Sequence, residues 1–207
     1  MRLYVKICGL TTRHAVEAAI NAGADAVGFV FAPSVREVTP ALAAQLARDI
    51  PLGVDIVAVA RHPSQALVDE IAHVLRPRWL QTDAGDIAGL SVPEGIAALP
   101  VWRSGSTPPA SLPARYLYEG AVSGAGLTAD WEEAARLALG GELILAGGLN
   151  AGNVERAVGT VRPFGVDVSS GVESAPGRKD PALIETFISR ARSAARTLSG
   201  EKHERDG

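Results

Sequence analysis

The sequence predicts one α/β domain in which eight parallel strands alternate with helices and close into a (β/α)8, or TIM, barrel. Three observations predict this architecture. Short apolar runs rich in β-branched residues recur eight times, and Ala/Leu-rich stretches with helical spacing lie between them. Several of these runs are nearly continuous in apolar residues, as expected of parallel strands that are covered on both faces. The 207 residues are enough for a compact barrel of this kind.

The expected elements follow one another along the chain in strand–helix order. The strands are predicted at residues 3–8, 26–30, 55–59, 78–81, 100–103, 115–118, 143–146 and 165–168. Helical spacing is clearest at residues 13–22, 41–50, 64–75 and 153–158. The Pro/Ser-rich stretch 104–113 predicts a loop in which a helix is short or lost. The barrel is expected to span residues 1–199, with a polar tail at 200–207.

An open, doubly wound sheet is the alternative to a closed barrel. Repeated strand–helix units form right-handed crossovers and a parallel sheet in either case. The glycine fingerprint GxGxxG that follows the first strand of dinucleotide-binding sheets is missing here. Eight units without that fingerprint favour the barrel.

Composition excludes several function classes. The net charge is −3, from 20 basic and 23 acidic residues, and the basic residues are scattered, so neither nucleic acid nor a membrane is expected as a partner. The single cysteine, Cys8, excludes a disulfide framework and a multi-thiolate metal site. The N-terminus lacks a signal peptide, and no segment approaches the about 20 apolar residues that span a bilayer, which predicts a cytoplasmic protein. Metal ligands are not expected, because the histidines are dispersed: His14, His62, His73 and His203.

Two neighbouring loops predict a phosphate site. In such barrels the chemistry lies at the carboxyl ends of the strands, and the loops after strands seven and eight commonly bind phosphate. Gly147 and Gly148 follow the seventh strand, and Ser169, Ser170 and Gly171 follow the eighth. Glycines allow the backbone to approach a ligand closely, and a short helix opening there directs amide groups at a dianion. Each loop alone is equally consistent with a tight turn and a helix cap.

Cys8 lies at the carboxyl end of the first strand. A lone cysteine on a strand is usually an inert buried side chain. Here the thiol is close to Lys6 and to the predicted phosphate site, and nearby positive charge is expected to lower its pKa toward neutrality. These residues leave both a catalytic and a structural role open.

Four segments resemble phosphoribosylanthranilate isomerase of tryptophan biosynthesis. They are KICGLTT, GADAVGFVFAPSVREVTP, LAGGLNAGNVERAV and PFGVDVSSGVESAPGRKD, in the family's order from Lys6 to about Asp180. The resemblance implies a (β/α)8 barrel that needs no metal or cofactor. It also implies an Amadori rearrangement of N-(5-phosphoribosyl)anthranilate to the carboxyphenylamino-deoxyribulose phosphate by general acid–base catalysis.

The resemblance also implies roles for individual residues. The family's general base falls on Cys8, and its anthranilate-binding arginine falls on Arg36, for which a solvated loop arginine is the alternative. The phosphate loops fall on Gly147, Gly148, Ser169, Ser170 and Gly171. Asp167 matches an aspartate of the last strand motif, where substrate contact and a capping or supporting role both remain open.

Three departures from the family pattern concern the active site. The family's sixth strand ends in Leu-Leu-Asp, and its aspartate is the general acid; this chain has YLYEG, which places Glu119 at that position. The following Gly-Gly-Thr-Gly-Lys loop is replaced by SGAGL at 123–127, without the lysine. The fourth strand has QTDAG at 81–85 in place of Gln-Leu-His-Gly. A glutamate displaces the carboxyl by about 1 Å, an error that costs about a hundredfold in rate unless the backbone compensates.

Other functions stay open at this stage. An indole-glycerol-phosphate synthase is disfavoured because the chain has no lysine-rich N-terminal extension, and a metal-dependent epimerase because strand-end ligands are missing. A non-catalytic barrel that binds a phosphorylated metabolite is the alternative from a different class. The expected partner is a small-molecule substrate, and the chain is expected to be a monomer or a homodimer.

Overall fold

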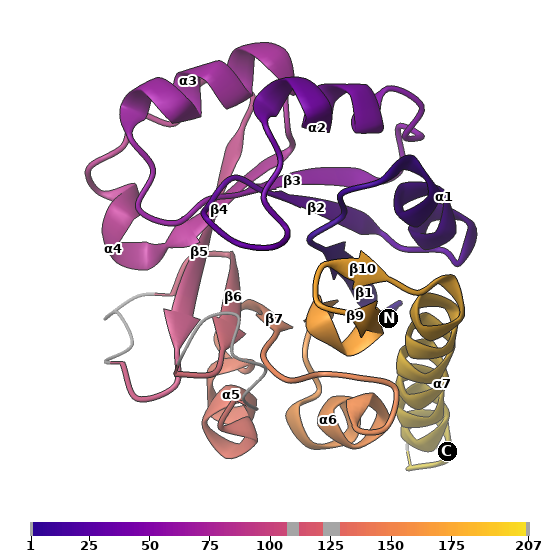
Figure 1. Ribbon diagram of the computed structural model, residues 1–207. Coiled ribbons are helices and arrows are strands. Elements are labelled where there is room, and N and C mark those ends of the chain that lie inside the picture. Colours follow the sequence, from indigo (N-terminus) through magenta and orange to yellow (C-terminus); the bar gives the residue numbers. More distant parts are fainter. Residues whose placement is uncertain (1, 107–111, 122–128, 206–207) are drawn as a thin grey trace.

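A closed barrel of eight parallel strands forms the centre of the molecule, and the helices surround it (Figure 1). The computed structural model describes residues 2–106, 112–121 and 129–205. The strands pair in sequence order, and β1 closes the ring against β8. They are β1 Tyr4–Cys8, β2 Ala26–Val30, β3 Asp55–Val59, β4 Trp79–Asp83, β5 Ala97–Arg103, β6 Arg115–Glu119, β7 Glu142–Leu145 and β8 Gly165–Val168.

The predicted fold class is confirmed, and β2, β3 and β8 have the predicted bounds. The largest difference is at β5, which begins at Ala97 and not at Pro100. Ala97 and Ala98 already pair with Trp79 and Leu80 of β4, so the missing N–H of Pro100 does not delay the strand.

The helices are α1 Arg13–Asn21, α2 Pro40–Ala47, α3 Gln65–Val74, α4 Ala84–Ile87, α5 Trp131–Leu137, α6 Val154–Val161 and α7 Pro181–Arg205. Side-chain oxygens of Thr12, Thr39, Ser64 and Asp130 accept backbone N–H groups at the starts of α1, α2, α3 and α5. The helix α7 continues past Ser199, where the sequence predicts a polar tail, because a single glycine at 200 does not end a helix.

The connections at the carboxyl ends of the strands differ in kind. Between β5 and β6 the described residues contain a turn at Ser104–Ser106 and no helix, and residues 107–111 lie outside the described part. After β8 the chain forms the short 3₁₀ helix η1, Ser170–Val172, and then the two-stranded hairpin of β9, Glu173–Ala175, and β10, Arg178–Lys179.

An aromatic and cationic cluster fills the amino-terminal end of the barrel. The Arg115 guanidinium lies 4.3 Å from the centroid of Phe164, 4.9 Å from that of Trp79 and 5.3 Å from that of Tyr4. Asp55 accepts the Tyr4 hydroxyl at 2.9 Å and the Trp79 indole N–H at 3.0 Å. Side chains of the barrel itself therefore fill this end, and a ligand would have to bind at the opposite end.

None of the helices in the described part of the chain combines the length and the apolar character needed to cross a bilayer.

Candidate active site

A cavity of about 210 Å³ opens at the carboxyl ends of the strands. Five residues predicted from the sequence line it together: Cys8, Arg36, Glu119, Asp167 and Ser169. Its wall also contains Gln81, Asp83 and Arg103, and the Gln81 side-chain oxygen is buried without a hydrogen-bond donor among the described residues. A buried acceptor without a donor is costly unless a ligand supplies one.

The Cys8 thiol lies beside a buried ion pair. The Lys6 ammonium, with no exposed surface, donates to Asp167 Oδ1 at 2.8 Å, and these two residues face each other across the β1–β8 pair. Burial alone would lower the pKa of Lys6, but the charge of Asp167 and contact with Cys8 raise it overall. Lys6 is therefore a permanent cation next to the sulfur.

The predicted lowering of the Cys8 pKa is not what the structure gives. Cys8 is only 6% exposed, and burial raises the pKa of its thiol, while the positive charges of Lys6 and Lys179 oppose that rise. The neighbouring cation was predicted from the sequence, but the burial of the sulfur was not, and removal from water outweighs the electrostatic attraction here.

The absence of a side chain at Gly28 makes room for this group on the neighbouring strand β2. A Cβ atom at Gly28 would lie 3.1 Å from Cys8 Sγ and 3.1 Å from Lys6 Nζ. Both contacts are tighter than an ordinary van der Waals separation, so a side chain here would displace the sulfur or the ammonium.

Arg36 is held by a carboxylate that the sequence analysis did not single out. Its Nε and Nη2 donate to the two oxygens of Glu173 at 2.7 and 2.8 Å, and Lys179 donates to the same carboxylate at 2.7 Å. Burial would raise the pKa of Glu173, but these bonds lower it to about 2. Glu173 and Lys179 both belong to the motif GVESAPGRKD, and this motif was the only sign of them in the sequence.

The two predicted phosphate loops touch one another at the rim. A Cβ atom at Gly171 would lie 1.9 Å from the carbonyl oxygen of Leu149, so only glycine fits at this position. Gly147 and Gly148 have φ values of 87° and 62°, the left-handed region in which their amides turn away from the strand direction. Of the loop residues predicted to bind phosphate, Ser169 is among those lining the 210 Å³ cavity, whereas Gly147, Gly148, Ser170 and Gly171 are not.

The candidate acid, Glu119, forms an ion pair with Arg103 of the preceding strand, β5. Arg103 Nη2 lies 3.0 Å from Glu119 Oε1 and 2.6 Å from Asp83 Oδ1. Arg103 and Glu119 are register partners of β5 and β6, and Asp83 ends β4. The loop expected to follow the acid, residues 123–127, lies outside the described residues.

The comparisons with known proteins decide the family. The family model for N-(5'-phosphoribosyl)anthranilate (PRA) isomerase matches residues 5–190. The chain belongs to this family. Relatives of this name from Bordetella petrii and Streptococcus pneumoniae are 38% and 41% identical; the alignments cover 97% and 96% of this chain, and 100% and 98% of the relatives.

Solved structures of PRA isomerases have the same fold. The enzyme from Thermotoga maritima is 30% identical with a TM-score of 0.80, over 92% of this chain and 99% of that one. Another structure of a PRA isomerase, in complex with reduced 1-(o-carboxyphenylamino)-1-deoxyribulose 5-phosphate, has 29% identity and a TM-score of 0.76 over the same shares.

One arrangement is unexpected for a PRA isomerase whose histidines are dispersed in sequence. Among the described residues, His62, Asp83 and Asp86 bring their possible metal-ligating atoms within 4.8 Å of one another. His62 Nδ1 is 2.9 Å from Asp86 Oδ1, and the side chain of His62 is exposed. The group could not be predicted from the sequence, because His62 follows β3 whereas Asp83 ends β4 and Asp86 lies in α4.

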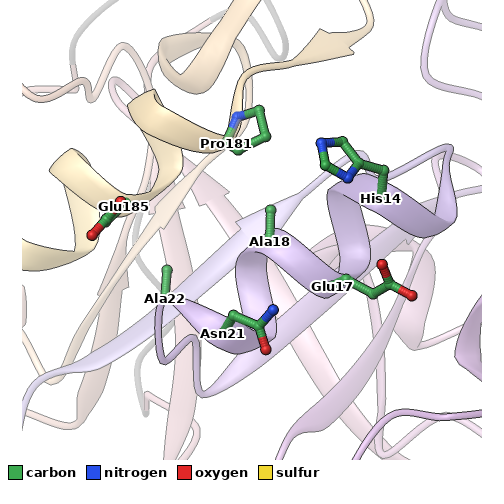
Figure 2. Close-up of a pocket in the computed structure, with 7 residues that line it drawn as sticks. All are labelled: His14, Glu17, Ala18, Asn21, Ala22, Pro181 and Glu185. Atoms are coloured by element: carbon green, nitrogen blue, oxygen red, sulfur yellow. The ribbon is translucent and has the colours of Figure 1, made fainter.

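A second hollow lies on the outside of the barrel (Figure 2). It has a volume of about 450 Å³ and lies between α1 and the start of α7. Figure 2 shows His14 of α1 and Pro181 of α7 at its edges, with Ala18 between them. Cys8 and Glu119 are not in its lining, which consists of His14, Glu17, Ala18, Asn21, Ala22, Pro181 and Glu185.

Proposed function

We propose that this protein converts N-(5-phosphoribosyl)anthranilate to 1-(2-carboxyphenylamino)-1-deoxyribulose 5-phosphate in tryptophan biosynthesis. Membership of the PRA isomerase family supports the reaction. The observation that carries it in the structure is the position of Cys8 and Glu119 in one cavity at the carboxyl ends of β1 and β6. A base and an acid that face the same ligand are what an aldose–ketose rearrangement needs.

The phosphate of the substrate would bind to the adjoining loops after β7 and β8. Backbone amides of Gly147, Gly148 and Gly171 and the hydroxyls of Ser169 and Ser170 would hold it. Fixing the phosphate orients the sugar, because it restricts the reacting carbons to a small part of the cavity.

Arg36 would bind the carboxylate of the anthranilate group. Its bonds to Glu173 use Nε and Nη2, so the N–H groups on Nη1 are available to the ligand. The bidentate pairing with Glu173 fixes the plane of the guanidinium before the ligand arrives, which limits the entropy that binding costs. Asp167 would contribute through Lys6, to which it is bonded, and lies close enough to the cavity to reach the sugar.

The reaction divides into two proton transfers. Glu119 in its protonated form gives a proton to the ring oxygen, the bond from that oxygen to C1′ breaks, and a protonated Schiff base forms. Cys8 as thiolate then removes the proton from C2′, which leaves a neutral enolamine that tautomerises to the ketone. Glu119 has lost one proton and Cys8 has gained one, and exchange with solvent restores both. The sequence moves protons only, so it needs no redox cofactor.

Lys6 makes the thiolate accessible in spite of burial. Its positive charge favours the ionised sulfur, while burial favours the thiol. The base therefore exists as a minority form that is strongly basic when it appears, which suits removal of a proton from carbon.

Assay of the purified chain with the phosphoribosylated anthranilate tests this function. Formation of the ketose phosphate, followed by mass spectrometry and NMR, together with growth of a tryptophan auxotroph that lacks the isomerase, is the expected result. Binding of the reduced product analogue without turnover would instead support the non-catalytic metabolite-binding barrel. As an enzyme of amino-acid biosynthesis it would act in the cytoplasm, and fractionation of cells that express it from its own promoter tests this.

We expect the chain to be a monomer or a homodimer. One solved structure is of monomers generated from the dimeric PRA isomerase of Thermotoga maritima. Sedimentation equilibrium over a range of concentrations distinguishes the two states for this chain.

A further inference from the structure

One nitrogen of Arg103 is shared between two carboxylates in the barrel cavity. Nη2 lies 2.6 Å from Asp83 Oδ1 and 3.0 Å from Glu119 Oε1, so the shorter contact is to Asp83. The three side chains are 24%, 18% and 14% exposed for Arg103, Asp83 and Glu119, and all line the cavity. An ion pair this sheltered is screened less than one at the surface.

The Arg36–Glu173 ion pair differs in geometry from the contacts that Arg103 makes. There, two nitrogens of one guanidinium bind both oxygens of one carboxylate at 2.7 and 2.8 Å. That arrangement, together with the hydrogen bonds from Lys179 and the Gly177 N–H, lowers the pKa of Glu173 to about 2. Arg103 instead divides one nitrogen between Asp83 and Glu119, and the contact to Glu119 is the longer of the two.

We propose that Asp83 is a positioning residue that draws Arg103 away from Glu119 and so leaves Glu119 able to carry the proton that it donates. The proposal rests on the function above, in which Glu119 is the general acid. Its basis is the juxtaposition of Asp83, Arg103 and Glu119 around one nitrogen.

The charges explain why an acid in this position needs such a partner. A carboxyl group next to an arginine is held in its ionised form, and an ionised carboxylate has no proton to give. Asp83 offsets the arginine in two ways: it takes the shorter bond to the cation, and it adds a second negative charge that disfavours ionisation of its neighbour. When Glu119 has released its proton, the same guanidinium stabilises the carboxylate that results.

Asp83 is itself anchored from the outer side. Its Oδ2 faces His62 Nε2 at 3.8 Å, and His62 is fixed to Asp86 through Nδ1 at 2.9 Å and through its backbone N–H at 3.1 Å. Thr82 donates to the same Asp86 at 3.0 Å. Asp86 therefore supports the residues around Asp83.

Asp69 of α3 offers a matched control. It is exposed, is not among the residues that line the cavity, and accepts a hydrogen bond from Gln65 Nε2 at 2.8 Å.

A double-mutant cycle tests the proposal on the full-length enzyme. Asp83→Asn should lower kcat by about ten- to a hundredfold with a KM change below about threefold, because Arg103 then pairs with Glu119 alone. Arg103→Met removes the cation, so the double variant Asp83→Asn/Arg103→Met should have the kcat of Arg103→Met and exceed that of Asp83→Asn by about tenfold. Asp69→Asn, the control, should keep kcat within about twofold of the parent enzyme.

Each outcome decides a different point. If Asp83→Asn is as active as the parent, or if Arg103→Met does not restore activity to it, Asp83 does not act through Arg103 and the proposal is wrong. A parent protein that fails to isomerise the substrate at all would instead overturn the proposed function. Circular dichroism checks that each variant is folded, and Asp83→Ser serves in the same cycle if the asparagine variant is not.

Discussion

Ser169 Oγ donates a hydrogen bond of 3.1 Å to the backbone carbonyl oxygen of Cys8. The bond joins the end of β1, which carries the thiol, to the loop after β8, which is predicted to bind phosphate. Lys179 holds the same serine from the other side, with 2.9 Å to its carbonyl oxygen and 3.2 Å to its hydroxyl. The thiol that we propose as the base and the loop that we propose as the phosphate anchor are therefore held at a fixed position relative to each other.

Replacing Cys8 should separate turnover from binding. Cys8→Ser and Cys8→Ala each remove the base, since a serine hydroxyl is a far weaker acid than a thiol and does not ionise here. We expect kcat to fall by about 10²–10⁴, with the affinity for the reduced product analogue changed by less than about fivefold. Stopped-flow kinetics and calorimetry measure the two quantities. Near-normal turnover in Cys8→Ala would remove the thiol from the mechanism.

Replacing Lys6 should make the thiol less reactive. Burial raises the pKa of Cys8 and Lys6 opposes that rise, so Lys6→Met should move the midpoint of Cys8 alkylation by iodoacetamide to higher pH. The variant also leaves Asp167 buried without its cation, which costs about 3–5 kcal/mol of folding free energy.

A second variant separates these two effects of Lys6. Lys6→Met/Asp167→Asn removes the unpaired charge and should recover much of the lost stability without restoring thiol reactivity at neutral pH. An alkylation midpoint that does not move in either variant would show that the ammonium does not act on the sulfur.

Gly171→Ala should abolish binding of the phosphate group. The added methyl would lie 1.9 Å from the Leu149 carbonyl oxygen, so the loops after β7 and β8 must separate. We expect the affinity for inorganic phosphate and for the product analogue to fall by about a hundredfold or more, measured by calorimetry. Gly159→Ala is the matched control, because nothing lies within 4 Å of its added methyl within helix α6. Equal affinities in the two variants would exclude these loops as the anchor.

Glu173 should contribute stability that depends on pH. Its pKa is lowered from 4.5 in the unfolded reference to about 2 in the folded protein. The contribution is therefore complete above about pH 4.5 and is lost as pH falls toward 2; it amounts to at most about 3 kcal/mol. Urea unfolding of Glu173→Gln and the parent should differ most at pH 7 and converge near pH 2. A difference that is the same at both pH values would contradict the assignment.

The sequence predicted the barrel well because its signals are local. The runs at 26–30, 55–59 and 165–168 are short and consist mostly of valine and other small or apolar residues, and the strands found there have the predicted limits. The rule that chemistry lies at the carboxyl ends of barrel strands then brought Cys8, Glu119 and Asp167 into one list, and all three line the cavity.

The remaining site features depend on contacts that local patterns do not encode. Arg36 and Glu173 are 137 positions apart, and the direction of each side chain beyond its strand follows from turns and not from a periodicity. The sign of the Cys8 pKa shift depends on how deeply the sulfur is buried, which a neighbouring lysine in the sequence does not reveal. The pairing of Arg103 with two carboxylates could not be predicted without knowing the register in which β4, β5 and β6 pair.

The junction of β1 with β8 also governs when the catalytic centre comes into existence. Lys6 and Asp167 are 161 positions apart and meet only across that junction. During synthesis, Lys6 and Cys8 therefore leave the ribosome early and Asp167 leaves it late. The proposed catalytic centre cannot form in a nascent chain until β8 has been synthesised. Two separately expressed halves of the chain would form an active enzyme only if they associated so that β1 paired with β8.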